Sequence, residues 1–465
     1  MSMINIGLTG VLANQIAMNT TAQNTANVNT EGYSRQEVTQ SALILGGLSN
    51  LNIGSGVTVD SIRRVADQAL VTRLETSSAE LSYSNHYYSG MSGLEELLGS
   101  ESLNLTNSFN DFFASVDEAT VAPESPAYRE QILAAANGVA STFNRSVNAI
   151  EEQMQNLNNQ FSVSVSLANA QLENISQLNI SIKEAHAKGQ STAGLTDQLD
   201  LSLRDLTENM GVNVLRKGDG TAEVSLPDGQ PLVIGESVAS IERVFSNTDP
   251  YGTELTLNFS GASMPVNEMG GTLGALIKLK EDEYEPNTEK LNELAEVFAT
   301  AVNDALATGI DLEGNVNTIN ADGTNGSPLF QFNALDPAAS LEITDISAEQ
   351  LALSTSGEIG DGGVLTDITS IITTTFTSTT FSNKTIYDTY SQMLGELGIN
   401  TNQAQQSLTT AQINQNEAQA ARDNVSAVNS DEEAANLMMY MNAYQANMKV
   451  VSAANQMFQS VLTAF

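Results

Sequence analysis

Residues 125–187 read SPAYREQILAAANGVASTFNRSVNAIEEQMQNLNNQFSVSVSLANAQLENISQLNISIKEAHA. Ser125-Pro126 places proline at the first position of a helix, where its missing N–H is not needed. Apolar residues then recur every three or four positions, as in a helix that buries one face. The expected buried row consists of Ile132, Ala136, Val139, Phe143, Val147, Ile150, Met154, Leu157, Phe161, Ser164, Ala168, Gln171, Ile175, Leu178, Ile182 and Ala185. This row predicts one helix of about 50 to 60 residues, on the order of 80 Å long. A helix of that length belongs to an elongated molecule.

The composition narrows the class of protein. A chain of 465 residues exceeds the roughly 100–200 residues of one domain, so several domains are expected. Acidic residues outnumber basic ones 55 to 18, and the formal charge of −37 repels nucleic acid and anionic lipid. Cysteine is absent, which excludes disulfides, thiolate nucleophiles and cysteine-bound metals. Apolar stretches stay below the roughly 18 residues that span a bilayer. We expect neither nucleic-acid binding nor membrane insertion.

Changes of periodicity divide the chain. Helical spacing alternates with strand-like stretches such as Val224 to Leu226 and Leu255 to Phe259. We therefore expect a mainly α, elongated multi-domain protein in which a long helical bundle carries smaller β parts, including an inserted small β domain. The expected segments are an N-terminal helix and extended arm (1–64), a first stretch of the helical bundle (65–211), a small β unit (212–270), a second stretch of the bundle (271–308), a β-rich outer region (309–381), a third stretch of the bundle (382–429) and a C-terminal helix (430–465).

Both ends of the chain lack charge. Residues 1–30 contain no Asp, Glu, Lys or Arg, and residues 436–465 contain only Lys449. Interface cores are depleted of charge because a charged group loses its hydration on burial. The uncharged ends therefore predict surfaces that become covered. These helices could instead belong to the protein's own core, but the absence of charge on their outer faces favours burial on more than one side.

Each end also shows a helical row at 4/3 spacing. The C-terminal row consists of Leu437, Met441, Tyr444, Met448, Val451, Asn455, Phe458, Leu462 and Phe465, and the N-terminal row of Ile4, Leu8, Val11, Gln15, Met18, Ala22 and Thr25. Asn455 is the one polar member of the C-terminal row and is expected to fix its register. Ser430, with Glu433 three residues later, predicts an N-cap and capping box that open a helix of roughly 50 Å.

Signatures of catalysis are missing from the sequence. His86 and His186 lie outside any metal-ligand spacing, and no GxSxG, Walker A or dinucleotide-binding motif occurs. Residues 311–315 resemble a calcium loop only loosely, because their glycine stands at the fourth position and not the sixth. Carboxylate pairs that converge across a cleft are invisible in a sequence, so an enzyme stays as an alternative. We expect no catalytic residues, no cofactor and no metal.

Two short motifs resemble a known family. Residues 24–36 (NTANVNTEGYSRQ) are similar to the N-terminal signature of flagellar axial proteins, the rod, hook and hook-associated proteins. Residues 430–437 (SDEEAANL), 443–446 (AYQA) and Met457-Phe458 resemble the matching C-terminal signature. Within this family, Gly-Tyr-Ser-Arg-Gln together with Asp-Glu-Glu is most similar to the hook-associated proteins of the hook–filament junction.

The resemblance implies an assembly role. Both termini would pair as coiled-coil helices in an inner tube, the middle would form outer domains, and the subunit would form a ring of eleven that is required for filament assembly and so for motility. The assembly surface would comprise Leu8, Val11, Met18, Asn24, Asn27, Gly32, Tyr33, Arg35, Leu437, Met441, Tyr444, Met448, Val451, Phe458, Leu462 and Phe465. Gly32 would turn the chain toward the outer domains, since glycine tolerates φ > 0, and Tyr33 and Arg35 would anchor that turn.

Further expectations about partners follow from the same resemblance. The partners would be other copies of the chain, the hook protein, the second junction protein and an export chaperone on the C-terminal helix, whose apolar row would otherwise aggregate. The protein would be secreted unfolded through the flagellar type III pathway, without a cleavable signal peptide, and would reside extracellularly in the flagellum. Longer family members carry a large extra outer domain, which should be reduced here. The alternatives are another axial protein (the hook protein or the second junction protein) and a secreted coiled-coil effector or adhesin.

Overall fold

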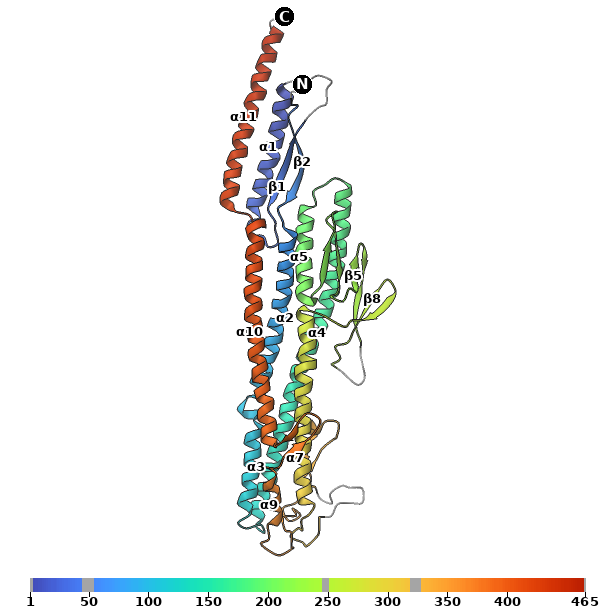
Figure 1. Cartoon of the computed structure of the whole chain (residues 1–465), viewed down its shortest axis with the longest axis vertical. Helices are drawn as coiled ribbons and strands as arrows, with labels where there is room; N and C mark the ends of the chain where they lie inside the picture. Colours follow the sequence, from blue (N-terminus) through green and yellow to red (C-terminus); the bar gives the residue numbers. More distant parts are fainter. Residues whose placement is uncertain (1–2, 44–53, 245–250, 318–327, 464–465) are drawn as a thin grey trace.

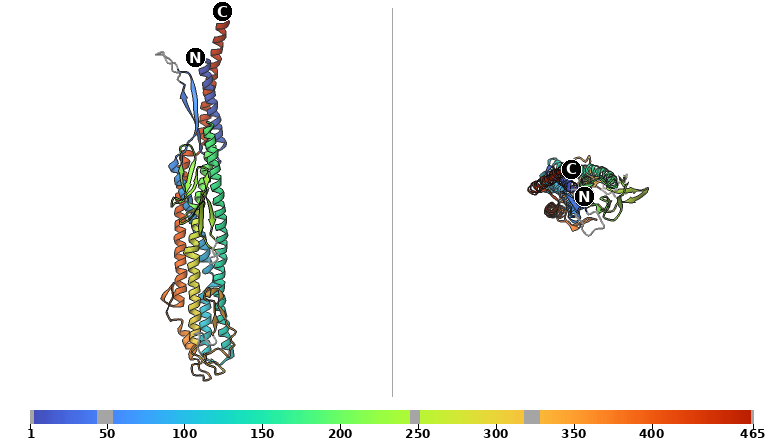
Figure 2. Two further views of the ribbon diagram at one scale, coloured as in Figure 1. Left: turned by 90° about the vertical axis from the view of Figure 1, so that its right-hand side faces the viewer. Right: turned by 90° about the horizontal axis from the view of Figure 1, so that it is seen from above.

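The computed structural model describes residues 3–43, 54–244, 251–317 and 328–463. It is a long, narrow rod with both chain ends at the same end (Figures 1 and 2). At that end lies a unit that we name the axial module: α1 (Met3–Ala26), β1 (Gln36–Ala42), β2 (Val57–Arg64) and α11 (Ser430–Thr463). The body comprises the described residues between 65 and 426. An elongated, mainly α architecture with paired terminal helices is thereby confirmed.

The helix α4 (Pro126–Ala187) runs along most of the body and is 62 residues long. It starts after Ser125 as N-cap, with proline in its first turn. All residues of the predicted buried row are buried except Met154 and Gln171, which are half-buried. The predicted long helix and the face that it buries are both confirmed.

Six further helices build the bundle with α4. They are α2 (Gln68–Leu98), α3 (Leu105–Ala119), α5 (Ala193–Met210), α6 (Gly271–Lys278), α7 (Glu285–Leu306) and α10 (Ile386–Ser426). A 3-10 turn, η1 (Glu101–Leu103), precedes α3, and a π-helical turn, η2 (Leu279–Tyr284), joins α6 to α7. The helices α2 and α10 lie side by side, as do α3 and α4 (Figure 1). None of the described helices is both long and apolar enough to cross a membrane.

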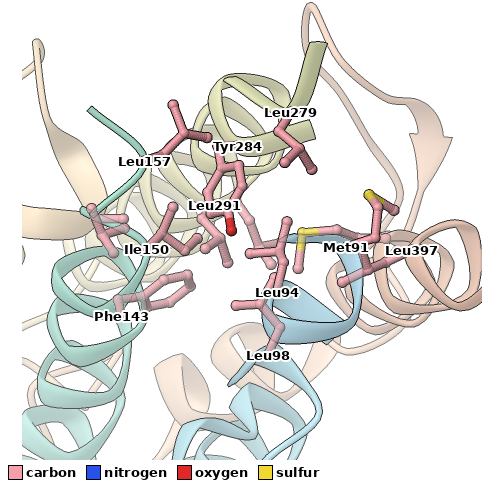
Figure 3. Close-up of a cluster of buried hydrophobic side chains, with 14 of the residues drawn as sticks. Met91, Leu94, Leu98, Phe143, Ile150, Leu157, Leu279, Tyr284, Leu291 and Leu397 are labelled. Carbon is pink, nitrogen blue, oxygen red and sulfur yellow. The ribbon is translucent and has the colours of Figure 1, made fainter. Parts of the chain in front are cut away.

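The hydrophobic core continues along the bundle. Figure 3 shows Met91 and Leu94 of α2 among residues of α4, α7 and α10, including Phe143, Leu291 and Leu397. A second group, at the end of the rod far from the termini, is aromatic and consists of Phe109, Phe112, Phe113, Phe298 and Phe330, whose rings contact one another. Burial of a large apolar side chain stabilises the fold by about 1.5–3 kcal/mol. The body therefore has a core of its own.

Two small antiparallel sheets pack against α4 on one flank of the rod (Figure 1). The strands are β3 (Asn213–Arg216), β4 (Ala222–Ser225), β5 (Pro231–Ile234), β6 (Ser237–Val238), β7 (Ser240–Arg243), β8 (Leu255–Phe259) and β9 (Ala262–Pro265). Asn179 of α4 bonds both backbone groups of Ala222, at 2.8 and 2.9 Å. Asn169 does the same for Ile241, at 2.8 Å each. These strands occupy the stretch at 212–270 where the small β unit is expected.

The prediction of a β-rich outer region at 309–381 is wrong in content. Its described residues form mostly loops, with β10 (Phe330–Gln331), β11 (Glu342–Ile343), β12 (Phe376–Thr377), which pairs with β13 (Ser382–Lys384), and the short helices α8 (Pro337–Ser340) and α9 (Gly363–Ser370). These loops contact the ends of α3, α4 and α7. Hydroxyl side chains of this region bond to carboxylates and do not line strands: Asp361 accepts from Ser354 Oγ, Thr355 Oγ1 and Ser356 Oγ. Residues 318–327 of this region and 44–53 of the expected arm lie outside the described residues.

Candidate assembly site at the paired termini

The helices α1 and α11 pack against each other through small residues. A Cβ on Gly7 would lie 2.7 Å from Val451 Cγ2, and one on Gly10 would lie 2.6 Å from Asn447 Oδ1. The buried face of α1 continues through Ala13, Ala17, Thr20, Thr21 and Asn24. Glycines at the contact let two helix backbones approach closely, so the pairing depends on the absence of side chains as much as on apolar ones.

Most of the predicted C-terminal row faces away from α1. Its residues Leu437, Met441, Met448, Phe458 and Leu462 are 41%, 45%, 45%, 57% and 62% exposed. The buried positions of α11 are instead Glu433 and Ala454, with the row members Tyr444 and Val451 half-buried. The prediction that this row is the helix-pairing seam is therefore wrong for most of its members in the single chain, because the small face of α1 selects a different side of α11. Val451, which meets Gly7, is an exception.

The remaining members of the two predicted rows divide in the same way. Val11 is 7% exposed and packs in the pair, Ile4 and Met18 are half-buried, and Leu8 is 48% exposed. The polar Asn455, expected to fix register, is exposed. Phe465 lies outside the described residues. The chain thus has an intrachain seam of small residues and, on α11, an outward row of large apolar residues.

Asn24 holds the base of the axial module together. Its Oδ1 accepts from Gln36 N and Tyr33 Oη, each at 2.9 Å. Its Nδ2 donates to Gln36 O at 2.9 Å and to Glu433 Oε2 at 3.2 Å. Asn24 is 1% exposed, so these partners replace water completely. One amide therefore joins the end of α1, the start of the arm and the start of α11.

The start of α11 differs from the prediction by one residue. The helix begins at Ser430, and Asn429 caps it, because Asn429 Oδ1 accepts from Asp431 N at 3.0 Å. Asparagine is as good an N-cap as serine. Glu433, expected to reach back to the cap, is 2% exposed and bonds to Asn24. The predicted capping box is wrong because tertiary pairing uses its carboxylate.

The turn after α1 contains three of the predicted residues. Gly32 has φ 77°, a left-handed conformation that favours glycine. Burial, with the nearby carboxylates of Asp197 and Glu433, raises the pKa of Tyr33 to about 12, so its hydroxyl remains a donor to Asn24. Arg35 bonds the body through its N–H to Ser426 O at 2.8 Å and pairs with Glu432 Oε2 at 3.1 Å.

Asn27 stands apart from this network. Its Nδ2 donates to Gln23 O at 2.9 Å, and its Oδ1 accepts from Thr30 Oγ1 at 3.1 Å. Both bonds are local, within the last turn of α1 and the loop that follows. The structure therefore brings Asn24, Tyr33, Arg35 and the Gly32 turn together, and gives Asn27 the role of shaping the end of the helix.

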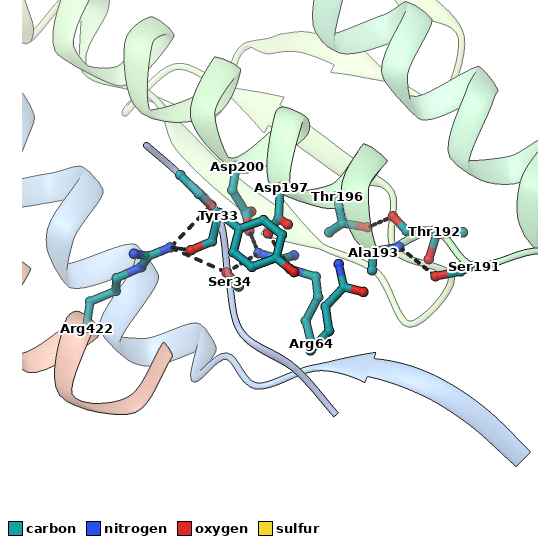
Figure 4. A network of polar contacts seen from close by, with 12 residues as sticks. Tyr33, Ser34, Arg64, Ser191, Thr192, Ala193, Thr196, Asp197, Asp200 and Arg422 are labelled. Atoms are coloured by element: carbon teal, nitrogen blue, oxygen red, sulfur yellow. Dashed lines mark hydrogen bonds and ion pairs between the residues drawn. The ribbon is translucent and has the colours of Figure 1, made fainter. Parts of the chain in front are cut away.

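A buried charge network beside the turn was not predicted. Arg64 of β2 pairs with Asp197 Oδ1 at 2.8 Å and with Asp200 Oδ2 at 2.5 Å, both on α5 (Figure 4). Arg216 of β3 pairs with Asp200 at 2.9 Å and with Glu75 of α2. Burial raises the pKa of Asp197, an effect that Arg64 partly opposes. These residues are far apart in sequence and follow no motif, so only the fold identifies them.

These observations define a class of protein: a rod-shaped subunit whose two terminal helices, uncharged apart from the first turn of α11 and Lys449, pair with each other and present an outward apolar row. Residues 91–320 match the family model described as the flagellar hook-associated protein FlgK helical domain, and residues 420–464 match the flagellar basal body rod FlgEFG protein C-terminal family. The chain belongs to the flagellar hook-associated protein 1 family, a family of structural flagellar proteins.

Individual relatives agree with this assignment. The chain is 25% identical to flagellar hook-associated protein 1 of Salmonella typhimurium (strain LT2), with 99% of each chain covered. It is 24% identical to the protein of that name from Bacillus subtilis (strain 168), with 97% and 95% covered. The alignment with the Salmonella relative spans 552 positions against 465 residues here.

A solved structure has the same fold. The flagellar hook junction protein FlgK from Burkholderia pseudomallei superposes with a TM-score of 0.65 at 16% identity, over 76% of this chain and 100% of that chain.

Proposed function

We propose that the chain is a non-enzymatic structural subunit of the bacterial flagellum that forms the hook–filament junction and is required for filament assembly on the hook. The observation that carries this proposal is the outward apolar row of α11. Phe458 and Leu462 are 57% and 62% exposed in a segment whose single charge is Lys449. In an isolated subunit this apolar row is exposed to water, whereas neighbouring subunits in an assembly cover it.

The partners in this proposal follow from the position of the row. Further copies of the chain, in a ring of eleven, would cover the sides of the axial module, and the hook protein and the second junction protein would contact its two ends. When identical subunits contact one another head to tail, they form a ring if the rotation from one subunit to the next divides the full circle evenly. The small-residue pairing of α1 with α11 supports this role, because it leaves the large apolar residues for other chains.

The route of assembly belongs to the same proposal. The chain would be exported unfolded through the flagellar type III pathway, without a cleavable signal peptide, and would reach an extracellular position. A chaperone would bind the C-terminal helix before export. The exposure of Met441 and Met448, 45% each, supports this step because an unprotected apolar row promotes association.

The test is complementation of a deletion strain, with electron microscopy and an assay for flagellin in the medium. The deletion should leave complete hooks without filaments and release flagellin monomers. The variant Phe458→Ser/Leu462→Ser should fail to restore filaments while the purified protein keeps its thermal stability, since both side chains are exposed.

The matched control is Val163→Ser/Leu167→Ser, which changes an exposed apolar pair of the same spacing on α4, 66% and 49% exposed. It should restore filaments. Missing hooks in the deletion strain would assign the chain to the rod or hook, and normal filaments would refute an axial role.

A further inference from the structure

We propose that the methionines of α11 are an oxidation site: a peroxide converts them to sulfoxides in the unassembled subunit, and the oxidised subunit no longer binds its partners. This inference rests on the proposed function, because it assigns a modification to the surface that assembly would cover. It is argued from the positions of the exposed methionines, from the chemistry of the thioether and from the apolar row to which two of them belong.

The methionines of the chain are distributed unevenly. The sequence contains 14 of them. Among the described residues six are exposed, and five of these lie on α11, the sixth being Met3 of α1. The five on α11 are between 45% and 58% exposed and consist of Met438, Met439, Met441, Met448 and Met457. Methionine is ordinarily among the most buried residue types, so its concentration on one exposed helix indicates a use for the thioether there.

The described methionines of the body are shielded from solvent. Met91 and Met210 are 0% exposed and Met393 is 2% exposed, and all three belong to the hydrophobic core. Met154 and Met264 are half-buried and pack against that core. A dissolved oxidant reaches exposed sulfur more readily than buried sulfur. A limited dose of peroxide should therefore modify α11 and leave the body folded.

The exposure of these side chains does not depend on the pairing of α11 with α1. In the pair, Glu433 and Ala454 are the buried positions of α11, and its C-terminal end extends past α1 (Figure 1). If the two helices separate or lose their helical order, α11 becomes more accessible and not less. Neighbouring chains that cover α11 would shield the methionines, so the subunit is most open to oxidation before it assembles.

The reaction needs an oxidant of the peroxide class, such as hydrogen peroxide. The lone pair of the sulfur attacks one peroxide oxygen, so an S–O bond forms and the O–O bond breaks. The sulfur is oxidised by two electrons, and the second peroxide oxygen takes both protons and leaves as water. The product is a sulfoxide, which is polar where the thioether was apolar.

A sulfoxide opposes burial in an assembly. Met441 and Met448 belong to the outward apolar row, so neighbours that bury this row would bury the new S=O oxygen as well. A buried polar oxygen without a hydrogen-bond donor weakens association. Before oxidation the flexible thioether adapts to surfaces of different shape, which suits a helix that would bind a chaperone first and other subunits later.

The experiment uses the purified full chain and hooks isolated from the deletion strain. The protein is partly oxidised with hydrogen peroxide, mixed with the hooks and sedimented, and mass spectrometry measures each methionine in the pellet and in the supernatant. Sulfoxide at Met441 and Met448 should be about tenfold lower in the hook-bound fraction. Met264 of β9 is the internal control, because its sulfoxide level should be equal in the two fractions.

Two further measurements test whether the sulfoxides are the cause. Reduction of the oxidised protein by methionine sulfoxide reductases A and B should restore binding to hooks. The amount of hook-bound protein should be the same before and after peroxide, whatever the untreated level, in a variant that combines Met438→Leu, Met439→Leu, Met441→Leu, Met448→Leu and Met457→Leu. The control variant Met154→Leu/Met264→Leu should lose binding after peroxide as the original protein does.

The possible failures are distinguishable. Equal sulfoxide at Met441 and Met448 in both fractions, binding that stays lost after reduction, or peroxide-sensitive binding in the five-leucine variant would each overturn this inference alone. Untreated protein that does not sediment with hooks would refute the proposed function, and the inference with it.

Discussion

Asn24 Nδ2 donates to Glu433 Oε2 across 3.2 Å, and this bond joins positions 409 residues apart in the chain. Both side chains are at most 2% exposed. The last turn of α1 and the first turn of α11 are therefore held at a fixed level relative to each other. Further along the pair, the glycines of α1 receive Asn447 and Val451 in the register that this bond sets.

Asn24→Ala should loosen the axial module and leave the body intact. The substitution removes the partner of both backbone groups of the half-buried Gln36 and of the buried Glu433 carboxylate, and each such loss at a buried group costs about 1–3 kcal/mol. We expect the opening free energy of α1 and α11 to fall by about 2–4 kcal/mol. Amide hydrogen exchange should show this as faster exchange in both helices.

Asn29→Ala is the matched control, because Asn29 is exposed in the loop after α1. It should leave exchange in both helices unchanged. Equal protection in the Asn24 variant and the original protein would contradict the role of this amide.

Gly10→Leu should separate the helix pair. A Cβ at this position already lies 2.6 Å from Asn447 Oδ1, and a leucine side chain would extend further into α11. Overpacking of this kind costs about 1–3 kcal/mol. Exchange protection of α11 should fall. The same residue introduced at the exposed Asn19 of α1 has free space and should preserve it; loss of protection in both variants would assign the effect to leucine itself.

Arg129→Met should destabilise the far end of the body. Arg129 is 1% exposed and donates to three backbone carbonyls, Pro123 O at 2.6 Å, Ala348 O at 3.1 Å and Leu351 O at 2.5 Å. Each buried carbonyl left without a donor costs about 1–3 kcal/mol of stability. The free energy of unfolding should therefore drop by about 3 kcal/mol or more. Urea unfolding measures it. Arg145→Met, an exposed position on the same helix, should change it by less than about 0.5 kcal/mol.

The titration of Glu75 should contribute to the pH dependence of the free energy of unfolding. Burial raises the pKa of Glu75 above 4.5, although its bond with Arg216 opposes the shift. Between 4.5 and the raised value the folded protein binds more protons than the unfolded chain, so this group's contribution to stability falls as pH rises through that window. Above the raised pKa the contribution stays at its lower level.

The measurement is the free energy of unfolding from pH 4 upward, by urea titration, for the original protein and for Glu75→Gln. The difference between the two should change with pH inside the window and become constant above it. Glu80→Gln, an exposed acid on the same helix, serves as the control for the general effect of removing one negative charge. A constant difference at every pH would contradict the assignment to Glu75.

Much of the fold could be read from local patterns. The row from Ile132 to Ala185 predicts α4 because a helix repeats its face at fixed intervals, and neighbours within one element determine that face. The absence of charge at both ends predicts terminal helices with unsolvated surfaces. The prediction of a β-rich region at 309–381 is wrong because serines and threonines there bond to carboxylates such as Asp361 and not to strand partners.

The sequence by itself determined the long helix, the uncharged ends and the turn at Gly32, since spacing, composition and φ preference are local properties. Only the tertiary structure decided which side of α11 meets α1, that Glu433 bonds to Asn24, and that Arg64 and Arg422 meet at Ser34. A helix with polar and apolar residues on several faces contains more than one plausible seam. The partner's shape selects among them, and here the selecting shape is the groove that Gly7 and Gly10 leave open.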